Sequence, residues 1–243
     1  DSLGNNFSQY EKNIQADRAG YYRMTGQNQK ALEVYLDLFN EVLFLSENNE
    51  KYVRELENFS LNLASLYKIQ GNYEKAIGWF LKSLDYRVKF KTEGLRPPVK
   101  FMHFNHIATC YRAKKDYKEA EKYYLKATKN IRELLKKTPK SEANAIRFWA
   151  FNIYTSFGDC YRLAGDYAKA WSCLDSSRIY KNAVPTSAKK IYNLSGGINR
   201  DEGKYKEALH AFKQVLDLNI KDFKSKHPTI IANHIDLGKT YLK

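Results

Sequence analysis

His103, His106 and Cys110 are the residues whose types and spacing most directly suggest metal chemistry. They follow one another at intervals of three and four residues, so on a helix they would share one face and could bind zinc. Such a site usually takes a fourth ligand, and no second His/Cys pair is close in the sequence. We therefore favour packing of these side chains between helices, and we expect no metal.

Cysteine could also form a disulfide. Cys110 and Cys160 begin two near-copies, CYRAKKDYKEA (110–120) and CYRLAGDYAKA (160–170), and Cys173 is the third cysteine. An odd number does not suggest a disulfide framework, and a disulfide needs Cα atoms within about 7 Å. We expect three buried free thiols. This favours a cytoplasmic location, with a periplasmic one as the alternative if a signal peptide has been removed from a start that lacks Met.

The sequence carries none of the short motifs that mark common catalytic sites. It has no nucleophile elbow, phosphate loop, nucleotide fingerprint or zincin motif. Gly196 and Gly197 resemble a loop in isolation, yet they are in register with a helix, and we interpret them as a point of close helix packing. We expect no enzymatic activity and no cofactor.

Positive charge is concentrated in the middle of the chain. The net charge is +14, and residues 82–140 hold 17 Lys or Arg against 6 Asp or Glu. This region should attract acidic partners, more weakly as salt rises. Nucleic-acid binding is one hypothesis, because Tyr117, Tyr123 and Tyr124 are interleaved with the cations, but those tyrosines mostly occupy packing positions. No apolar run approaches the roughly 20 residues that span a bilayer.

The two near-copies belong to a repeat that occurs five times. Its second halves start at residues 26, 71, 115, 165 and 203, at intervals of 45, 44, 50 and 38 residues. Apolar residues within each copy have helical spacing. Gly-Asn-Tyr or Gly-Asp-Tyr interrupts the pattern, because Gly ends one helix and Asn or Asp caps the next. Each copy is therefore predicted to be a helical hairpin.

The chain resembles the tetratricopeptide repeat family. The pattern is carried by Ala64, Tyr67, Gly71, Asn72, Tyr73, Ala76, Phe80 and Ser83, and again by Ala108, Tyr111, Asp116, Tyr117, Ala120, Tyr124 and Ala127. Asn28 and Lys115 depart from it, replacing the hairpin Tyr of the first copy and the Gly of the third. The resemblance implies an all-α, right-handed solenoid of antiparallel helical hairpins.

We predict a single array over residues 1–243. It would hold five complete repeats and a partial sixth, at approximately 10–47, 52–93, 99–138, 143–183, 187–224 and 228–243. The partial last repeat leads us to expect that the natural protein continues beyond Lys243, because a solenoid needs a capped end. The periods exceed the family's usual 34 residues. Longer helices or longer connections would explain this, and the prolines lie in GLRPPVK (94–100), KKTPKSEA (136–143), NAVPTSAKK (182–190) and KHPTI (226–230).

In this family the first helices of the hairpins line the concave face. The residue after the aromatic of each first helix is basic in all five repeats, forming a ladder of Arg23, Lys68, Arg112, Arg162 and Arg200. One turn earlier stand Gly20, Ser65, Thr109, Asp159 and Gly197. Asn58, Asn105 and Asn193 also fall on first helices, where an amide could bond a ligand's main chain. In the alternative interpretation, each cation pairs with an acid of its own hairpin, such as Asp116 or Asp166.

We predict a protein-interaction scaffold that binds an acidic or phosphorylated peptide in a basic concave groove. Two alternatives stay open. One is the sensor domain of a bacterial signalling protein whose output module lies outside this chain, and the other is a basic solenoid that binds nucleic acid.

Overall fold

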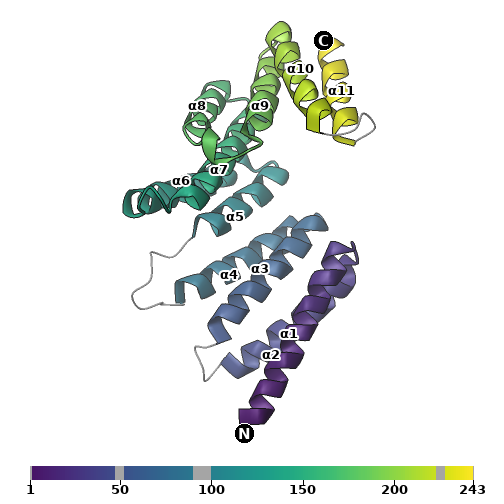
Figure 1. Ribbon diagram of the computed structural model, residues 1–243, viewed down its shortest axis with the longest axis vertical. Coiled ribbons are helices and arrows are strands. Elements are labelled where there is room, and N and C mark those ends of the chain that lie inside the picture. The colour runs from purple at the N-terminus through teal and green to yellow at the C-terminus, as the bar shows by residue number, and fades with distance from the viewer. Residues whose placement is uncertain (1, 47–51, 90–99, 223–227, 243) are drawn as a thin grey trace. The chain divides into compact units, whose positions relative to one another are not determined.

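The computed structural model describes residues 2–46, 52–89, 100–222 and 228–242 (Figure 1). These residues form eleven α-helices and one short 3-10 helix, with no strand among them, which confirms the all-α prediction. The chain divides into two compact units, Asp1–Asp116 and Tyr117–Lys243, and each is described by itself. The boundary falls inside the third predicted repeat, and the single array remains a prediction.

Unit 1 consists of α1 (Ser2–Met24), α2 (Asn28–Ser46), α3 (Val53–Ile69), α4 (Tyr73–Lys89) and α5 (Phe101–Ala113). Each of these helices packs against the next one along the chain. Because the apolar residues recur at helical spacing, they are buried between the helices. Phe39, Leu56 and Leu63 belong to one buried cluster, and Phe80 on α4 is also almost fully buried.

Unit 2 consists of α6 (Tyr117–Lys137), α7 (Asn144–Leu163), α8 (Tyr167–Arg178), the 3-10 helix η2 (Lys181–Ala183), α9 (Ser187–Asp201), α10 (Tyr205–Asp222) and α11 (Pro228–Tyr241). Consecutive α-helices again pack together, and α7 also packs against α9. Tyr124, Phe151, Leu174 and Ile198 are buried in its core.

Glycines with positive φ end the first helix of four hairpins, as the repeat predicts. Gly26, Gly71, Gly165 and Gly203 have φ between 76° and 82°. The hairpin Asn and Asp act as predicted too: Asn72 Oδ1 accepts a hydrogen bond from the Lys75 amide, and Asp166 Oδ1 from that of Lys169. Lys115 occupies the glycine position of the third repeat and adopts φ 62°, a conformation that costs an L-residue about 1 kcal/mol or more.

Gly196 and Gly197 lie inside α9 and bring neighbouring side chains close, which confirms the packing interpretation. A Cβ on Gly196 would stand 2.8 Å from the Phe212 ring, and one on Gly197 would stand 3.2 Å from Arg162 Cδ. Gly158 on α7 is equally tight, since its Cβ would meet Leu194 at 3.0 Å.

The long repeat periods come at least partly from long helices, because α6 has 21 residues and α7 has 20. α6 runs into KKTPKSEA as far as Lys137, and α9 begins at Ser187 inside NAVPTSAKK. GLRPPVK lies outside the described residues except for Lys100, and of KHPTI only Pro228 to Ile230, the start of α11, is described. Among the described helices, none is sufficiently long and apolar to cross a membrane.

Candidate functional site

The predicted ladder residues fall into two sets. Arg23, Lys68 and Arg112 form the unit 1 ladder, near the ends of α1, α3 and α5. Arg162 and Arg200 form the unit 2 ladder, near the ends of α7 and α9. Their surroundings within each unit differ.

Arg23 and Asn58 line a groove of about 690 Å³ between α1 and α3. Arg23 Nη1 donates a hydrogen bond to Asn62 Oδ1 at 3.4 Å, and Asn62 Nδ2 donates to the Asn58 carbonyl at 3.1 Å. Asp17 and Glu55 also line this groove. It therefore presents amides and charges of both signs, and its walls are not uniformly basic.

Lys68 and Arg112 are cations of the unit 1 ladder that lie close enough to repel each other. Lys68 Nζ donates to Thr109 Oγ1 at 2.9 Å, and that hydroxyl in turn donates to the His106 carbonyl at 2.8 Å. Burial lowers the pKa of Lys68, and the charge of Arg112 lowers it further while Cys110 opposes the change. None of these influences on the lysine comes from a carboxylate.

Asn105 lies on α5, one turn before Thr109. Its side-chain Oδ1 is buried and has no hydrogen-bond partner among the described residues. An unpaired buried acceptor costs about 1–3 kcal/mol, so this amide locally destabilises unit 1, on the α5 face that also carries Thr109 and Arg112.

In unit 2, carboxylates neutralise the ladder. Arg162 Nε and Nη2 donate to Asp159 Oδ1 at 3.0 and 2.8 Å, and Arg162 Nη1 donates to Asp201 Oδ2. Arg200 contacts Asp201 at 3.3 Å and Asp236 at 3.8 Å. Asp201 thus bridges both ladder arginines. Asn193 is exposed on α9.

In unit 2 the ladder arginines are therefore paired with acids, as the alternative interpretation proposed. The acids are Asp159 and Asp201 rather than Asp166. Asp166 does not reach Arg162; it caps α8 and pairs with Lys169. The sequence signal that could have identified the true partner is Asp159, three residues before Arg162, because side chains three apart on a helix are neighbours.

The residues considered for zinc have other roles. Among the described residues no group of three or more His, Cys, Asp and Glu could hold a metal ion. Burial lowers the pKa of His103 and of His106 to about 4, and His106 stacks on Phe80 with ring centroids 5.0 Å apart. All three cysteines are buried thiols outside any disulfide, and burial raises the pKa of Cys110 to about 11 and that of Cys173 to about 12.

A buried polar cluster between α3, α4 and α5 was not predicted. Ser83 Oγ donates to the Glu57 carbonyl at 2.9 Å and lies 3.1 Å from His103 Nε2. With the hydroxyl proton donated to that carbonyl, Ser83 can accept a hydrogen bond from the Nε2–H tautomer of His103. Arg87 Nε lies 2.8 Å from Glu57 Oε1. Burial raises the pKa of Glu57, although the charge of Arg87 opposes this.

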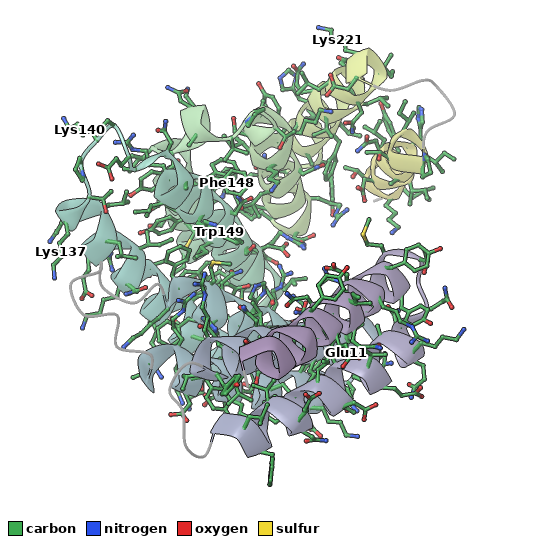
Figure 2. The ribbon with its side chains drawn as sticks, turned by 60° about the horizontal axis from the view of Figure 1, so that its bottom comes forward. Glu11, Lys137, Lys140, Phe148, Trp149 and Lys221 are labelled. Atoms are coloured by element: carbon green, nitrogen blue, oxygen red, sulfur yellow. The ribbon has the colours of Figure 1, made fainter. Side chains whose placement is uncertain are left out.

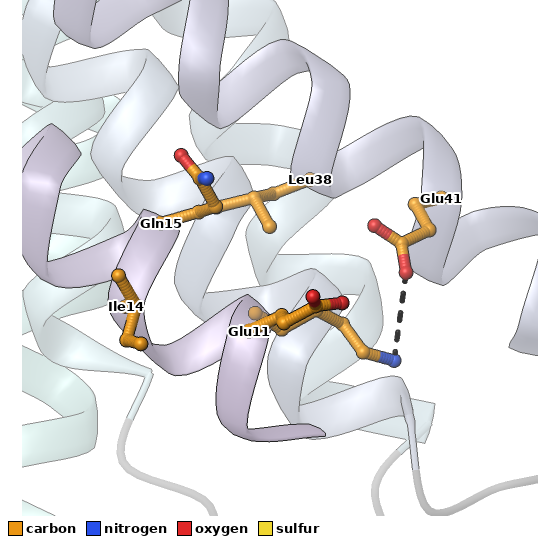
Figure 3. A pocket seen from close by; sticks show the side chains of 6 residues that line it. Glu11, Ile14, Gln15, Leu38 and Glu41 are labelled. Carbon is orange, nitrogen blue, oxygen red and sulfur yellow. Dashed lines mark ion pairs between the residues drawn. The ribbon is translucent and has the colours of Figure 1, made fainter. Parts of the chain in front are cut away.

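A second, smaller pocket of about 330 Å³ lies between α1 and α2. Figure 3 shows Glu11, Ile14 and Gln15 on one side of it and Leu38 and Glu41 on the other, with the ion pair as a dashed line. Lys12, which is buried, makes that ion pair with Glu41 at 3.8 Å. Because its cation Lys12 is paired with Glu41 and Glu11 adds a second carboxylate, this pocket does not suit an anionic ligand.

Successive antiparallel hairpins, with glycine turns and small residues at their contacts, define a helical repeat protein. The sequence profile of the tetratricopeptide repeat family matches residues 59–87, 104–133 and 189–220. The chain therefore contains tetratricopeptide repeats in these three segments, and such repeats form protein-interaction scaffolds. The sequence matches no curated protein.

Solved structures share the fold at low sequence identity. The crystal structure of BtubC (BKLC) from P. vanneervenii is 14% identical, with a TM-score of 0.66 over 88% of this chain and 83% of that one. A putative kinesin light chain with TPR-like repeats from Podosopora anserina is 18% identical, with a TM-score of 0.62 over 88% and 97%. A Rap protein complexed with Competence and Sporulation Factor is 19% identical, with a TM-score of 0.60 over 85% and 53%.

Proposed function

We propose that the chain is a scaffold whose unit 1 ladder binds an acidic or phosphorylated segment of a partner protein. The observation that carries this proposal is the environment of Lys68. The lysine is half-buried beside Arg112 and donates to a neutral hydroxyl. A bound carboxylate or phosphate would relieve the repulsion of the two cations and form charge-assisted hydrogen bonds with both.

The rest of the unit 1 surface suits an extended peptide. Asn58 and Asn62 line the α1–α3 groove beside Arg23, and amides of this kind bond to a peptide main chain. Asp17 and Glu55 in the same groove would repel a uniformly acidic ligand. We therefore place the ligand's anionic group at Lys68 and Arg112, with a neutral or mixed-charge stretch along the groove.

The test is a binding measurement with labelled peptides of matched length that are phosphorylated, acidic or neutral, followed by fluorescence anisotropy. Lys68→Glu combined with Arg112→Glu is expected to weaken the phosphorylated and acidic peptides about 100-fold, since two charge-assisted contacts become repulsive. Lys75→Glu combined with Lys82→Glu on α4 is the matched control, with the same charge change in the same unit.

The control variant should keep its affinity to within a factor of about three. Circular dichroism should show both variants folded. Equal weakening by the two variants would mean that net charge alone attracts the peptides, and unchanged affinity in the ladder variant would remove Lys68 and Arg112 from the site.

A further inference from the structure

The solvent-exposed face of α6 is covered by cations. α6 contains seven Lys or Arg and three Glu. At 3.6 residues per turn, six of these cations fall within about a third of the helix circumference, opposite the buried Ala120, Tyr124, Ala127 and Ile131. We call them the lysine face: Lys118, Lys122, Lys126, Lys129, Arg132 and Lys136, all exposed.

The lysine face is long and straight. From Lys118 to Lys136 a helix rises about 27 Å, and neighbouring cations on the face are three or four residues apart. Lys137 and Lys140 project outward where α6 ends (Figure 2), and both are exposed. They extend the same charge beyond the helix.

The repeat itself provides the comparison that separates function from folding. The second helices of other hairpins occupy equivalent places in the repeat, yet their charge is mixed. α2 has one Lys and three acidic residues, and α10 has three of each sign. A hairpin therefore does not need a cationic outer face, and a single-sign surface is a device for attracting an anionic partner.

We propose that the lysine face binds an anionic membrane surface. The width of the lysine face suits a flat partner, because Glu119 and Glu121 lie just outside this face, one on each side. Glu119 pairs with Lys122, and Glu121 accepts a hydrogen bond from the Tyr161 hydroxyl. A plane touches only the sector that the cations occupy. A nucleic-acid groove encloses a helix more fully and would bring phosphates against both glutamates.

The side chains on the face suit electrostatic attachment rather than insertion. Five of the six are lysines, which act on phosphates as point charges, and Leu125 is the large apolar side chain among them, 50% exposed. Glu133 is exposed within the same sector and offsets one of the six positive charges. Each lysine is attracted by the negative surface potential of an anionic membrane, and salt screens that attraction.

Co-sedimentation with vesicles tests the proposal. The 243-residue chain should bind phosphatidylcholine vesicles that contain about 30% phosphatidylserine and leave pure phosphatidylcholine vesicles unbound. Binding should fall at least tenfold between about 0.1 and about 0.5 M salt. Lys118→Glu, Lys126→Glu and Lys129→Glu together should lower the partition coefficient by roughly 100-fold.

The matched control is Lys206→Glu, Lys213→Glu and Lys221→Glu on α10, a second helix in the same unit with the same charge change. This variant should keep binding to within about threefold, and both variants should remain helical by circular dichroism. Equal loss in the two variants, or no binding by the unmodified chain, would overturn the proposal. So would tighter binding to a duplex DNA than to the anionic vesicles, because the partner class would then be nucleic acid.

Discussion

Arg23 and Lys68 of the unit 1 ladder occupy the same repeat position as Arg162 and Arg200 of the unit 2 ladder, but the two pairs have different kinds of hydrogen-bond partner. In unit 1, Arg23 and Lys68 donate to the side chains of Asn62 and Thr109, which are uncharged. In unit 2, Asp159, Asp201 and Asp236 surround Arg162 and Arg200. A repeat position therefore does not define a site by itself, because the residues one turn away decide whether its charge is available to a ligand.

The units also differ in how they bury histidine, and this gives the largest expected effect. His103 and His106 have a folded pKa of about 4 because they are buried, against about 6.5 in an unfolded chain. The unfolded state thus binds more protons between these values, so unit 1 should lose stability as pH falls from about 6.5 to about 4. Glu57, whose pKa burial raises, opposes the loss. We expect a net decrease on the order of 3 kcal/mol.

Urea unfolding followed by Trp79 fluorescence would measure this, in a Trp149→Phe and Trp171→Phe background that leaves a tryptophan only in unit 1. His103→Gln should reduce the slope of stability against pH, since glutamine keeps a donor near Ser83 without titrating. His210→Gln, at an exposed position in unit 2, is the control. If the slope of stability against pH were unaltered in His103→Gln, the pH dependence could not be attributed to His103.

Close packing in unit 2 gives the next effect. Gly196→Ala places a Cβ 2.8 Å from the Phe212 ring, and overpacking of this kind costs about 2 kcal/mol. Gly78→Ala on α4 of unit 1 is the matched change, because nothing lies within 4 Å of its Cβ. Alanine there should stabilise by up to about 1 kcal/mol. Thermal unfolding should show a lower melting temperature for Gly196→Ala and a higher one for Gly78→Ala. Equal shifts in melting temperature would refute the packing argument.

The difference between the ladders can itself be reduced. Asp159→Asn together with Asp201→Asn removes the carboxylates that neutralise Arg162 while keeping side chains of the same shape. Unit 2 should then bind the phosphorylated peptide about tenfold better than before, with a modest loss of stability. The measurement is best made in the Lys68→Glu and Arg112→Glu background, where unit 1 no longer contributes. No gain there would show that charge availability does not explain the contrast.

The sequence predicted the hairpins because their signals are local. Gly71, Gly165 and Gly203 end helices by backbone conformation, and Asn72 and Asp166 cap the helices that follow. The close approach at Gly196 was predictable for the same reason, since its position in the repeat assigned it to a helix contact.

The site was only partly predictable, because its character depends on contacts between hairpins. Asp201 accepts a hydrogen bond from Arg162, which lies 39 residues earlier in the sequence. Thr109 accepts one from Lys68, 41 residues earlier. A comparison of equivalent repeat positions does not predict these contacts between hairpins. Likewise Glu57, Ser83 and His103 come from three helices, and none of their spacings indicated a buried cluster. The local signals that the unit 2 ladder would be neutralised were Asp159, three residues before Arg162, and Asp201, directly after Arg200.

Lys115 gives the smallest expected effect and tests how strictly the glycine turn is required. It has the left-handed φ of 62° that glycine adopts at the other four turns, at the point where α5 ends and unit 1 meets the start of α6 in the sequence. Lys115→Gly should remove strain of about 1 kcal/mol, partly offset by the greater freedom of glycine in the unfolded chain. Gly165→Ala, which makes the reverse change at the equivalent turn of unit 2, should destabilise by a similar amount. Urea unfolding of the two variants would show shifts of opposite sign if the backbone conformation sets the energy, whereas a loss of stability in Lys115→Gly would mean that contacts of the lysine side chain outweigh the strain.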